Sequence, residues 1–274
     1  MSQTIACANQ KGGVGKTTTV VNLATYLGRK GRRVLVLDLD PQGNATSGFG
    51  VDRDAVTGTT YEAMSDGQPL ATSVIPSGSD GVDLVPSSIG LAALEVDLAG
   101  VAQRERRLAR VIAPVVGAYD DVFIDCPPSL GLLTVNALTA ADAVLIPLQC
   151  EYYALEGLSQ LIATIDLVRD NLNPALRVGG VLLTMFDART KLSSDVAAEV
   201  RRHLRDTVYD TIVPRSVRLA EAPSYGQPIA RYSPDSRGAR AYRELADEYL
   251  ARVGPPTAAA ATTTSTAALA AVSA

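Results

Sequence analysis

Histidine, cysteine and long apolar runs are scarce in this 274-residue chain, and each shortage excludes a class of protein. One histidine and three widely separated cysteines provide no metal-ligand spacing, so a zinc site is not expected. No run approaches the ~20 apolar residues that a membrane span needs, and no basic segment precedes the first apolar run, so we expect no signal peptide. The net charge of -4 is no general sign of nucleic-acid binding, which would need a local basic patch.

Short apolar runs alternate with segments of helical periodicity. We interpret the runs as strands at 4–9, 33–39, 82–86, 121–125, 143–149, 178–186 and 209–214. Helices are expected from the phosphate-loop region to Gly31, and near 104–116, 130–138, 155–171, 193–205 and 237–252. This alternation predicts an α/β fold: a doubly wound, mostly parallel sheet flanked by helices on both faces, with ligands at the carboxyl ends of the strands.

The chain is expected to form a single domain over residues 1–254. Residues 255–274 are rich in Ala and Thr and lack a strong apolar face, so we expect a disordered tail there. Cys7, Cys126 and Cys150 are expected to be structural and unpaired, which suits a reducing cytoplasm.

The strongest motif follows the first apolar run and opens the first expected helix. Its glycines allow a tight turn with inward N–H groups, and the helix start adds a positive dipole end, which together suit a polyphosphate. Lys16 is expected to reach the β- and γ-phosphates, and the Thr17 hydroxyl to ligate Mg²⁺. Gln10 replaces the first glycine of the general pattern. The motif reads Lys11-Gly12-Gly13-Val14-Gly15-Lys16-Thr17-Thr18.

Two of the expected strands end in aspartates. The run 121–125 closes on Asp125, which matches a Walker B carboxylate that holds Mg²⁺ through water. The run 33–39 leads into a segment with two aspartates two residues apart, Asp38 and Asp40. For Asp38, a supporting role in catalysis and a structural role both remain open.

With these motifs the sequence resembles the deviant Walker A ATPases, and most closely their ParA/Soj partition branch. The resemblance covers about residues 3–253 and includes Asp40-Pro41-Gln42-Gly43-Asn44 and the blocks 127–134, 149–157 and 221–224. It implies that Lys11 reaches across a homodimer to the other subunit's nucleotide, and that Asp40 positions or activates the attacking water. Lys11, Lys16 and Asp40 would then be the catalytic residues, with ATP and Mg²⁺ as cofactors. The implied nucleotide-binding residues are Lys11, Gly12, Gly13, Val14, Gly15, Lys16, Thr17, Thr18, Pro214 and Ser216.

The same resemblance implies DNA and protein partners. Non-specific double-stranded DNA would contact Arg189 and Arg218, and a ParB-like centromere-binding protein would stimulate hydrolysis of ATP on the nucleoid. Residues 189–243 support a DNA contact, because 11 basic minus 6 acidic residues give +5 in a chain of net charge -4. Ser216 stands where relatives commonly have asparagine.

The function expected from this resemblance is an ATP-dependent switch that segregates DNA. The alternative is a MinD-like or cargo-positioning ATPase that acts without DNA, and a metabolic P-loop enzyme is a third possibility. MinD-like proteins end in a basic amphipathic helix. Because residues 257–274 contain no Lys, Arg or aromatic residue, we expect no membrane partner.

Overall fold

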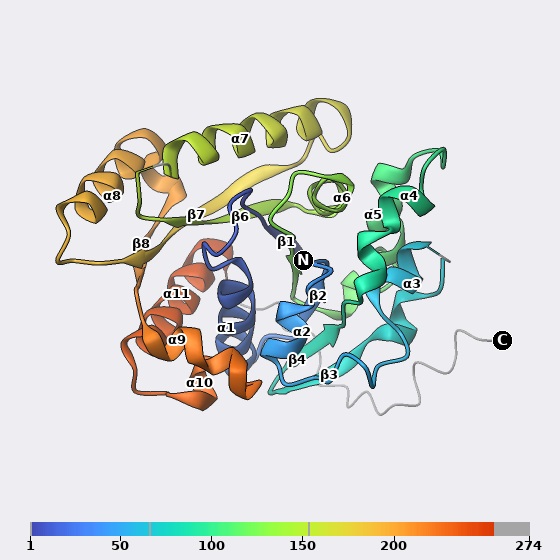
Figure 1. Cartoon of the computed structure of the whole chain (residues 1–274), viewed down its shortest axis with the longest axis horizontal. Coiled ribbons are helices and arrows are strands. Elements are labelled where there is room, and N and C mark those ends of the chain that lie inside the picture. The colour runs from blue at the N-terminus through green and yellow to red at the C-terminus, as the bar shows by residue number, and fades with distance from the viewer. Residues whose placement is uncertain (1, 66, 153, 255–274) are drawn as a thin grey trace.

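One eight-stranded sheet runs through the computed structural model, which describes residues 2–65, 67–152 and 154–254 (Figure 1). Its strand order is β3-β4-β2-β5-β1-β6-β7-β8, and β3 alone among these pairs antiparallel. The order reverses direction next to β1, as in a doubly wound fold. The strands are β1 (Gln3–Cys7), β2 (Val34–Asp38), β3 (Ile75–Ser79), β4 (Val82–Val85), β5 (Asp121–Asp125), β6 (Ala143–Gln149), β7 (Arg177–Phe186) and β8 (Val208–Pro214).

Helices cover both faces of the sheet, which confirms the predicted fold class (Figure 1). One face carries α1 (Lys16–Arg29), α2 (Asn44–Gly48), α9 (Val217–Glu221), α10 (Ile229–Tyr232) and α11 (Arg237–Val253). The other carries α3 (Thr60–Ser65), α4 (Leu94–Asp97), α5 (Arg107–Ile112), α6 (Leu132–Ala140), α7 (Ala154–Asn171) and α8 (Lys191–Leu204). Within the described ranges, no helix has both the length and the apolar character to cross a membrane.

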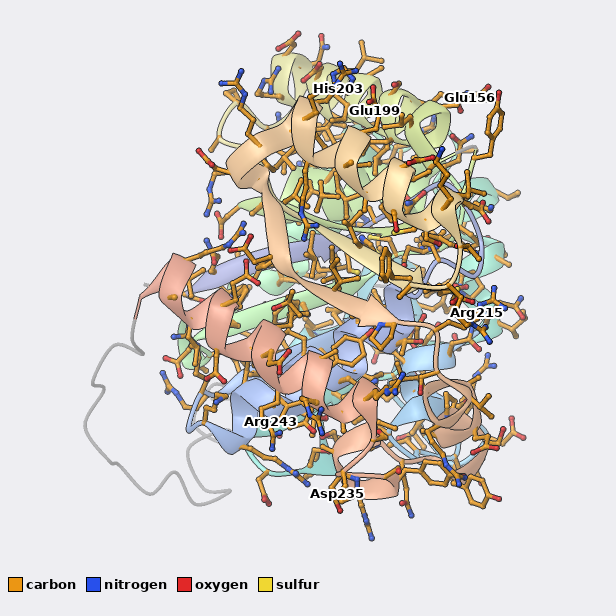
Figure 2. The ribbon with its side chains drawn as sticks, turned by 90° about the vertical axis from the view of Figure 1, so that its left-hand side faces the viewer. Glu156, Glu199, His203, Arg215, Asp235 and Arg243 are labelled. Carbon is orange, nitrogen blue, oxygen red and sulfur yellow. The ribbon has the colours of Figure 1, made fainter. Side chains whose placement is uncertain are left out.

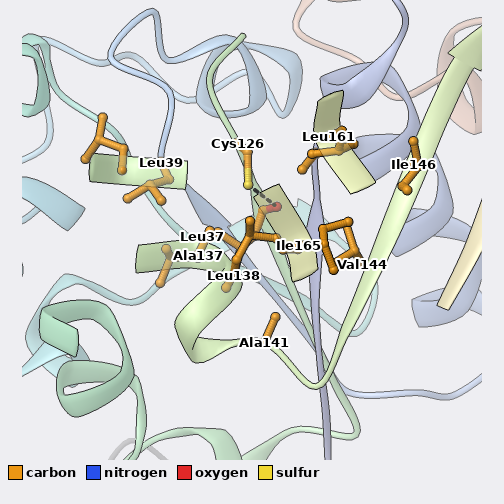
Figure 3. Packing of buried hydrophobic residues seen from close by; sticks show 14 of the residues in the cluster. Leu37, Leu39, Cys126, Ala137, Leu138, Ala141, Val144, Ile146, Leu161 and Ile165 are labelled. Atoms are coloured by element: carbon orange, nitrogen blue, oxygen red, sulfur yellow. Dashed lines mark hydrogen bonds between the residues drawn. The ribbon is translucent and has the colours of Figure 1, made fainter. Parts of the chain in front are cut away.

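The core forms because successive strand residues point to opposite faces. Along β2, Leu35 and Leu37 pack in the cluster under α6 and α7, whereas Val34 and Val36 pack against the α1 side. Figure 3 shows part of the first cluster, with Leu37 and Leu39 on one side, Val144 and Ile146 of β6 on the other, and residues of α6 and α7. The three cysteines are buried and unpaired, as predicted.

Two predictions of secondary structure were wrong. The expected helix over 104–116 is broken into a 3₁₀ turn at Arg104–Arg106, the short α5, and another 3₁₀ turn at Val116–Ala118. Pro114 explains the second break, since proline has no N–H and its ring clashes with the preceding turn of a helix. Strand β3 was missed. The expected disordered tail lies outside the described residues.

Candidate active site

The phosphate loop joins β1 to α1 at the carboxyl edge of the sheet. Gly13 and Gly15 have positive φ angles of 74° and 93°, which side chains with a Cβ rarely adopt. Gly15 is the residue before α1, so the loop delivers the chain directly into the positive end of that helix. Gly13 and Gly15 are therefore required by the backbone.

Hydrogen bonds hold this loop to the neighbouring strands. The side-chain amide of Asn9 donates to the Pro147 carbonyl at 2.7 Å, and its oxygen accepts from the Lys11 N–H at 3.0 Å. On the other side, the Thr184 hydroxyl donates to the Val14 carbonyl at 2.8 Å. Because β6 and β7 both anchor it, the loop is preorganised before any ligand arrives.

The two lysines of the motif lie in different surroundings. Lys16 is 6% exposed, and its ammonium donates to the Lys11 carbonyl at 3.2 Å across the loop. The Lys11 side chain is 45% exposed, turns away from the loop and forms an ion pair with Glu151, just after β6. The Lys16 ammonium thus lies within the phosphate loop, whereas the Lys11 side chain lies on the surface.

Asp125 and Asp38 lie opposite each other in the register of β5 and β2. Both oxygens of Asp125 are buried and accept no hydrogen bond from the described residues. Burial and the charge of Asp38 raise the pKa of Asp125 well above its usual range, while Thr17 and Lys16 oppose the shift. An unsatisfied buried carboxylate beside a threonine hydroxyl suits a hard cation.

Asp38 is occupied with structural contacts. Its Oδ2 accepts from the N–H and hydroxyl of Thr46 at 2.8 and 2.7 Å, and its Oδ1 accepts from the Asp40 N–H at 3.2 Å. Burial raises the pKa of Asp38 to about 6, against these hydrogen bonds. Of the two roles left open by the sequence, the structure favours the structural one: Asp38 holds the start of α2 and the backbone of Asp40.

Asp40 begins the turn between β2 and α2 and faces the phosphate loop. It is 6% exposed, and its Oδ1 accepts from the Gln42 N–H at 2.9 Å. Side chains from other segments hold this turn in place. The Ser87 hydroxyl donates to the Asp40 carbonyl. The Arg53 guanidinium donates to the carbonyls of Pro41 and Gln42. The second oxygen of Asp40 remains available to a ligand in the adjoining cleft.

A cleft of about 550 Å³ lies over the loop and brings together Lys16, Thr17 and Asp40. Its volume is in the range of small-molecule sites. The wall opposite the loop has residues to which the sequence analysis assigned no role. Met185 could have been found, because it is the next-to-last residue of β7, at the carboxyl end of a strand; its φ is 50°. These additional residues include Val21, Asn22, Ser47, Gly48, Met185, Leu219, Ala222, Ser224 and Gln227.

Pro214 and Ser216 lie next to this cleft but do not line it. Pro214 ends β8 opposite Phe186, the neighbour of Met185. Ser216 precedes α9, which contributes Leu219 to the wall. Their expected contacts with a base therefore stay predictions.

The expected DNA-contacting arginines are on the surface, each in an ion pair. Arg189, whose side chain is 87% exposed, pairs with Asp187 at 2.7 Å, and Arg218 pairs with Glu221 at 2.9 Å. Figure 2 shows this side of the molecule, with Arg215 and Arg243 exposed and with Glu199 beside His203 on α8. Acidic partners are thus interspersed among the basic residues of this surface.

A glycine loop between a strand and a helix, a buried lysine within it and acidic ends on the neighbouring strands define a P-loop nucleotide-binding protein. No group of three or more His, Cys, Asp or Glu side chains suited to a metal occurs in residues 2–65, 67–152 and 154–254. Mg²⁺ suits this arrangement, since it keeps several waters and takes one or two protein ligands plus phosphate oxygens.

Comparison with known proteins narrows this class. A family model described as an AAA domain matches residues 2–178. The sporulation initiation inhibitor protein Soj of Bacillus subtilis is 53% identical, over 92% of this chain and 99% of that protein. The chromosome partitioning protein ParA of Myxococcus xanthus is 51% identical, over 92% of this chain and 89% of that protein. The chain belongs to the ParA/Soj family of chromosome-partitioning P-loop ATPases.

Solved structures agree with this assignment of the fold. Cobyrinic acid a,c-diamide synthase from Mycobacterium smegmatis, solved with an ATP analogue and magnesium, superposes with a TM-score of 0.80 at 41% identity. The similarity covers 90% of this chain and 93% of that one. The predicted α/β P-loop fold and the predicted family are therefore confirmed.

Proposed function

We propose that this protein is a DNA-partitioning switch operated by ATP. ATP binding closes a homodimer that holds non-specific double-stranded DNA, and hydrolysis releases the DNA. The observation that carries this proposal is the different position of the two lysines. Lys16 lines the nucleotide cleft, whereas Lys11 lies exposed outside it. A cation placed there can serve a second copy of the chain better than its own nucleotide.

In the proposed reaction, water attacks the γ-phosphorus of ATP, and ADP leaves. The Lys16 ammonium neutralises charge on the transferred phosphate, and Asp40, which lines the cleft, orients the water and accepts its proton. Thr17 and, through water, Asp125 would hold Mg²⁺. When bound, Mg²⁺ supplies charge neutralisation on the β- and γ-phosphate oxygens.

Dimerisation would complete the site. Lys11 of one copy would reach the phosphates of the other and offset the negative charge that grows in the transition state, as an arginine finger does. Lys11 must leave Glu151 to do so. A ParB-like centromere-binding partner would speed this slow hydrolysis, and the protein would act in the cytoplasm on the nucleoid.

DNA would be held by phosphate contacts alone. Arg189 and Arg218 are exposed and would exchange Asp187 and Glu221 for DNA phosphates. Contacts of this kind give binding that is sensitive to salt and blind to sequence. The proposed surface would therefore bind DNA of any sequence, and more weakly as the salt concentration rises.

Co-sedimentation with DNA and with anionic liposomes, in the presence of Mg·ATP, tests the proposal. We expect the protein to pellet with DNA only, and the double variant Arg189→Glu, Arg218→Glu to lose this retention. The double variant Arg106→Glu, Arg110→Glu, at two exposed arginines outside residues 189–243, is the matched control and should retain DNA. Retention of DNA by the double variant would remove DNA from the proposal, and pelleting with liposomes would support the rival positioning ATPase.

A further inference from the structure

A second cavity lies at the opposite edge of the sheet from the nucleotide cleft. It has a volume of about 210 Å³ and shares no residue with the cleft. Residues near the starts of β1, β6 and β7 line it, together with residues of β8 and of the carboxyl end of α11. α11 packs beside β8 (Figure 1). Its lining is Gln3, Ile5, Ala143, Leu145, Arg177, Gly179, Tyr209, Tyr249, Arg252 and Val253.

Tyr209 presents its hydroxyl to this cavity. The residue is 3% exposed, yet nowhere in the described chain does its hydroxyl take part in a hydrogen bond. Its ring is fixed between Arg252, whose Cζ lies 4.0 Å from the ring centroid, and Gly180, where a Cβ would overlap the ring. Burial raises the pKa of Tyr209 to about 12, so the phenol is a proton donor at neutral pH.

Arg177, an exposed residue at the start of β7, brings a positive charge to the edge of the same cavity. Its guanidinium has no ion pair or side-chain hydrogen bond with the described residues. The Nη1 atom lies 3.9 Å from the point where a Cβ of Gly179 would stand, so the side chain folds back over β7 toward the cavity. A Cβ on Gly179 would also approach the Ala143 Cβ to 2.9 Å, so glycine keeps this space open.

The other charged groups around the cavity are already paired. Arg252 donates to Glu248 and to the Val208 carbonyl, both at 2.8 Å. Asp121 is paired with Arg32 and accepts from the Tyr249 hydroxyl at 2.7 Å. The single hydroxyl proton of Tyr249 is shared with the Gln3 side-chain oxygen at 3.3 Å, which leaves the Gln3 amide N–H groups as donors. The unpaired groups are therefore donors, and the net unpaired charge is positive.

We propose that this cavity binds a phosphate group, either free phosphate or a small phosphomonoester. The guanidinium of Arg177 matches the geometry of phosphate oxygens, the Tyr209 hydroxyl offers a preoriented donor, and Gln3 adds an amide. The cavity is larger than one phosphate, which leaves room for a short organic group. This site is separate from ATP hydrolysis.

Calorimetric titration of the full-length protein tests the proposal. The nucleotide cleft is first saturated with a non-hydrolysable Mg·ATP analogue, which also fills the γ-phosphate position, and inorganic phosphate or glycerol 3-phosphate is then added. We expect saturable binding of at least one probe, weakened tenfold or more by Tyr209→Phe and by Arg177→Gln. Arg110→Gln, on the opposite face of the sheet, should bind as the wild type does. Tighter binding of glycerol 3-phosphate identifies an ester as ligand, and tighter binding of phosphate identifies the free ion.

The proposal is overturned if neither probe binds the wild type, or if both variants bind as tightly as it does. Thermal unfolding without any probe adds an independent readout. Tyr209→Phe should leave the melting temperature unchanged or raise it, because the hydroxyl makes no hydrogen bond within the described residues. A lowered melting temperature would mean that the hydroxyl already has an internal partner.

Discussion

Lys11 of the phosphate loop is ion-paired with Glu151 of its own chain. The pair is partly exposed, with side-chain exposures of 45% and 28%, so it contributes about 0–1 kcal/mol. Removing this ion pair should still favour dimerisation, because it frees Lys11 to reach another copy of the chain. In the proposed dimer, this ion pair would therefore compete with the contact of Lys11 to the other copy.

We expect Glu151→Gln to strengthen the ATP-dependent dimer by about two- to fivefold, the equivalent of ~0.4–1 kcal/mol. Sedimentation with Mg·ATP in an Asp40→Ala background, which slows hydrolysis, measures the dimer dissociation constant. Glu156→Gln, an exposed glutamate on α7 (Figure 2), is the matched control and should have no effect. An unchanged or weaker dimer in Glu151→Gln would show that the pair does not compete with dimerisation.

Asp40→Asn should remove hydrolysis and keep nucleotide binding. Asparagine retains an oxygen for the Gln42 N–H but cannot accept a proton from water, so we expect kcat to fall by about 10²-fold or more. Steady-state phosphate release measures the rate, and calorimetry measures Mg·ATP affinity. Asp54→Asn, an exposed aspartate beyond α2, should turn over normally. Normal turnover by Asp40→Asn would exclude the carboxylate from the reaction.

Gly28 allows α1 to pack directly on the turn between β3 and β4. A Cβ at this position would overlap the Asp80 carbonyl oxygen and meet Val82. We expect Gly28→Ala to lower the free energy of unfolding by about 1–3 kcal/mol, despite the better helix propensity of alanine. Gly117→Ala, where a Cβ meets nothing within 4 Å, should be tolerated in the same urea titration. Equal stability of the two variants would contradict this packing.

Glu248 ties α11 to β8 and makes stability depend on pH. It accepts from the N–H groups of Asp210 and Thr211 at 2.8 and 2.9 Å, and from Arg252. Burial opposes ionisation, but these hydrogen bonds outweigh it and lower the pKa of Glu248. Its stabilisation is therefore present above the unfolded pKa of about 4.3 and is lost as the pH falls through the lowered folded value.

We expect Glu248→Gln to cost about 1–3 kcal/mol at pH 7, with a gap to the wild type that narrows below about pH 4. Urea unfolding at several pH values measures both effects. The exposed Glu244→Gln on the same helix should match the wild type throughout. A gap independent of pH would show that the charge of Glu248 is not what stabilises the contact.

The sequence predicted the strands best where apolar runs were buried on both faces. β5 and β6 have the predicted bounds because each runs between polar or turn-forming residues. β3 was missed because Pro76 and Gly78 are untypical of strands and only one of its five residues is buried. The Asp80-Gly81 dipeptide between β3 and β4 was a hairpin signal that could have revealed it.

The sequence predicted the residues of the phosphate-loop and aspartate motifs, but not the residues that other segments contribute to the wall of the cleft. Lys16, Thr17 and Asp40 were placed correctly at one cleft because carboxyl ends of parallel strands meet at one edge. Leu219, Ala222 and Gln227 come from a segment without strand or helix periodicity of its own, so only the tertiary fold brings them there. The ion pair of Arg189 was missed because the charge count began at that residue and left out Asp187.

The claim on which the rest depends is that Mg·ATP sits on the phosphate loop with Lys16 as its principal cation. Calorimetric titration of Mg·ATP into the wild type and Lys16→Ala is the decisive measurement, with Lys30→Ala, in an exposed pair with Asp247, as control. We predict saturable binding to the wild type and the control, and loss of binding in Lys16→Ala. Absence of heat with the wild type, or unchanged affinity in Lys16→Ala, would contradict the proposed function.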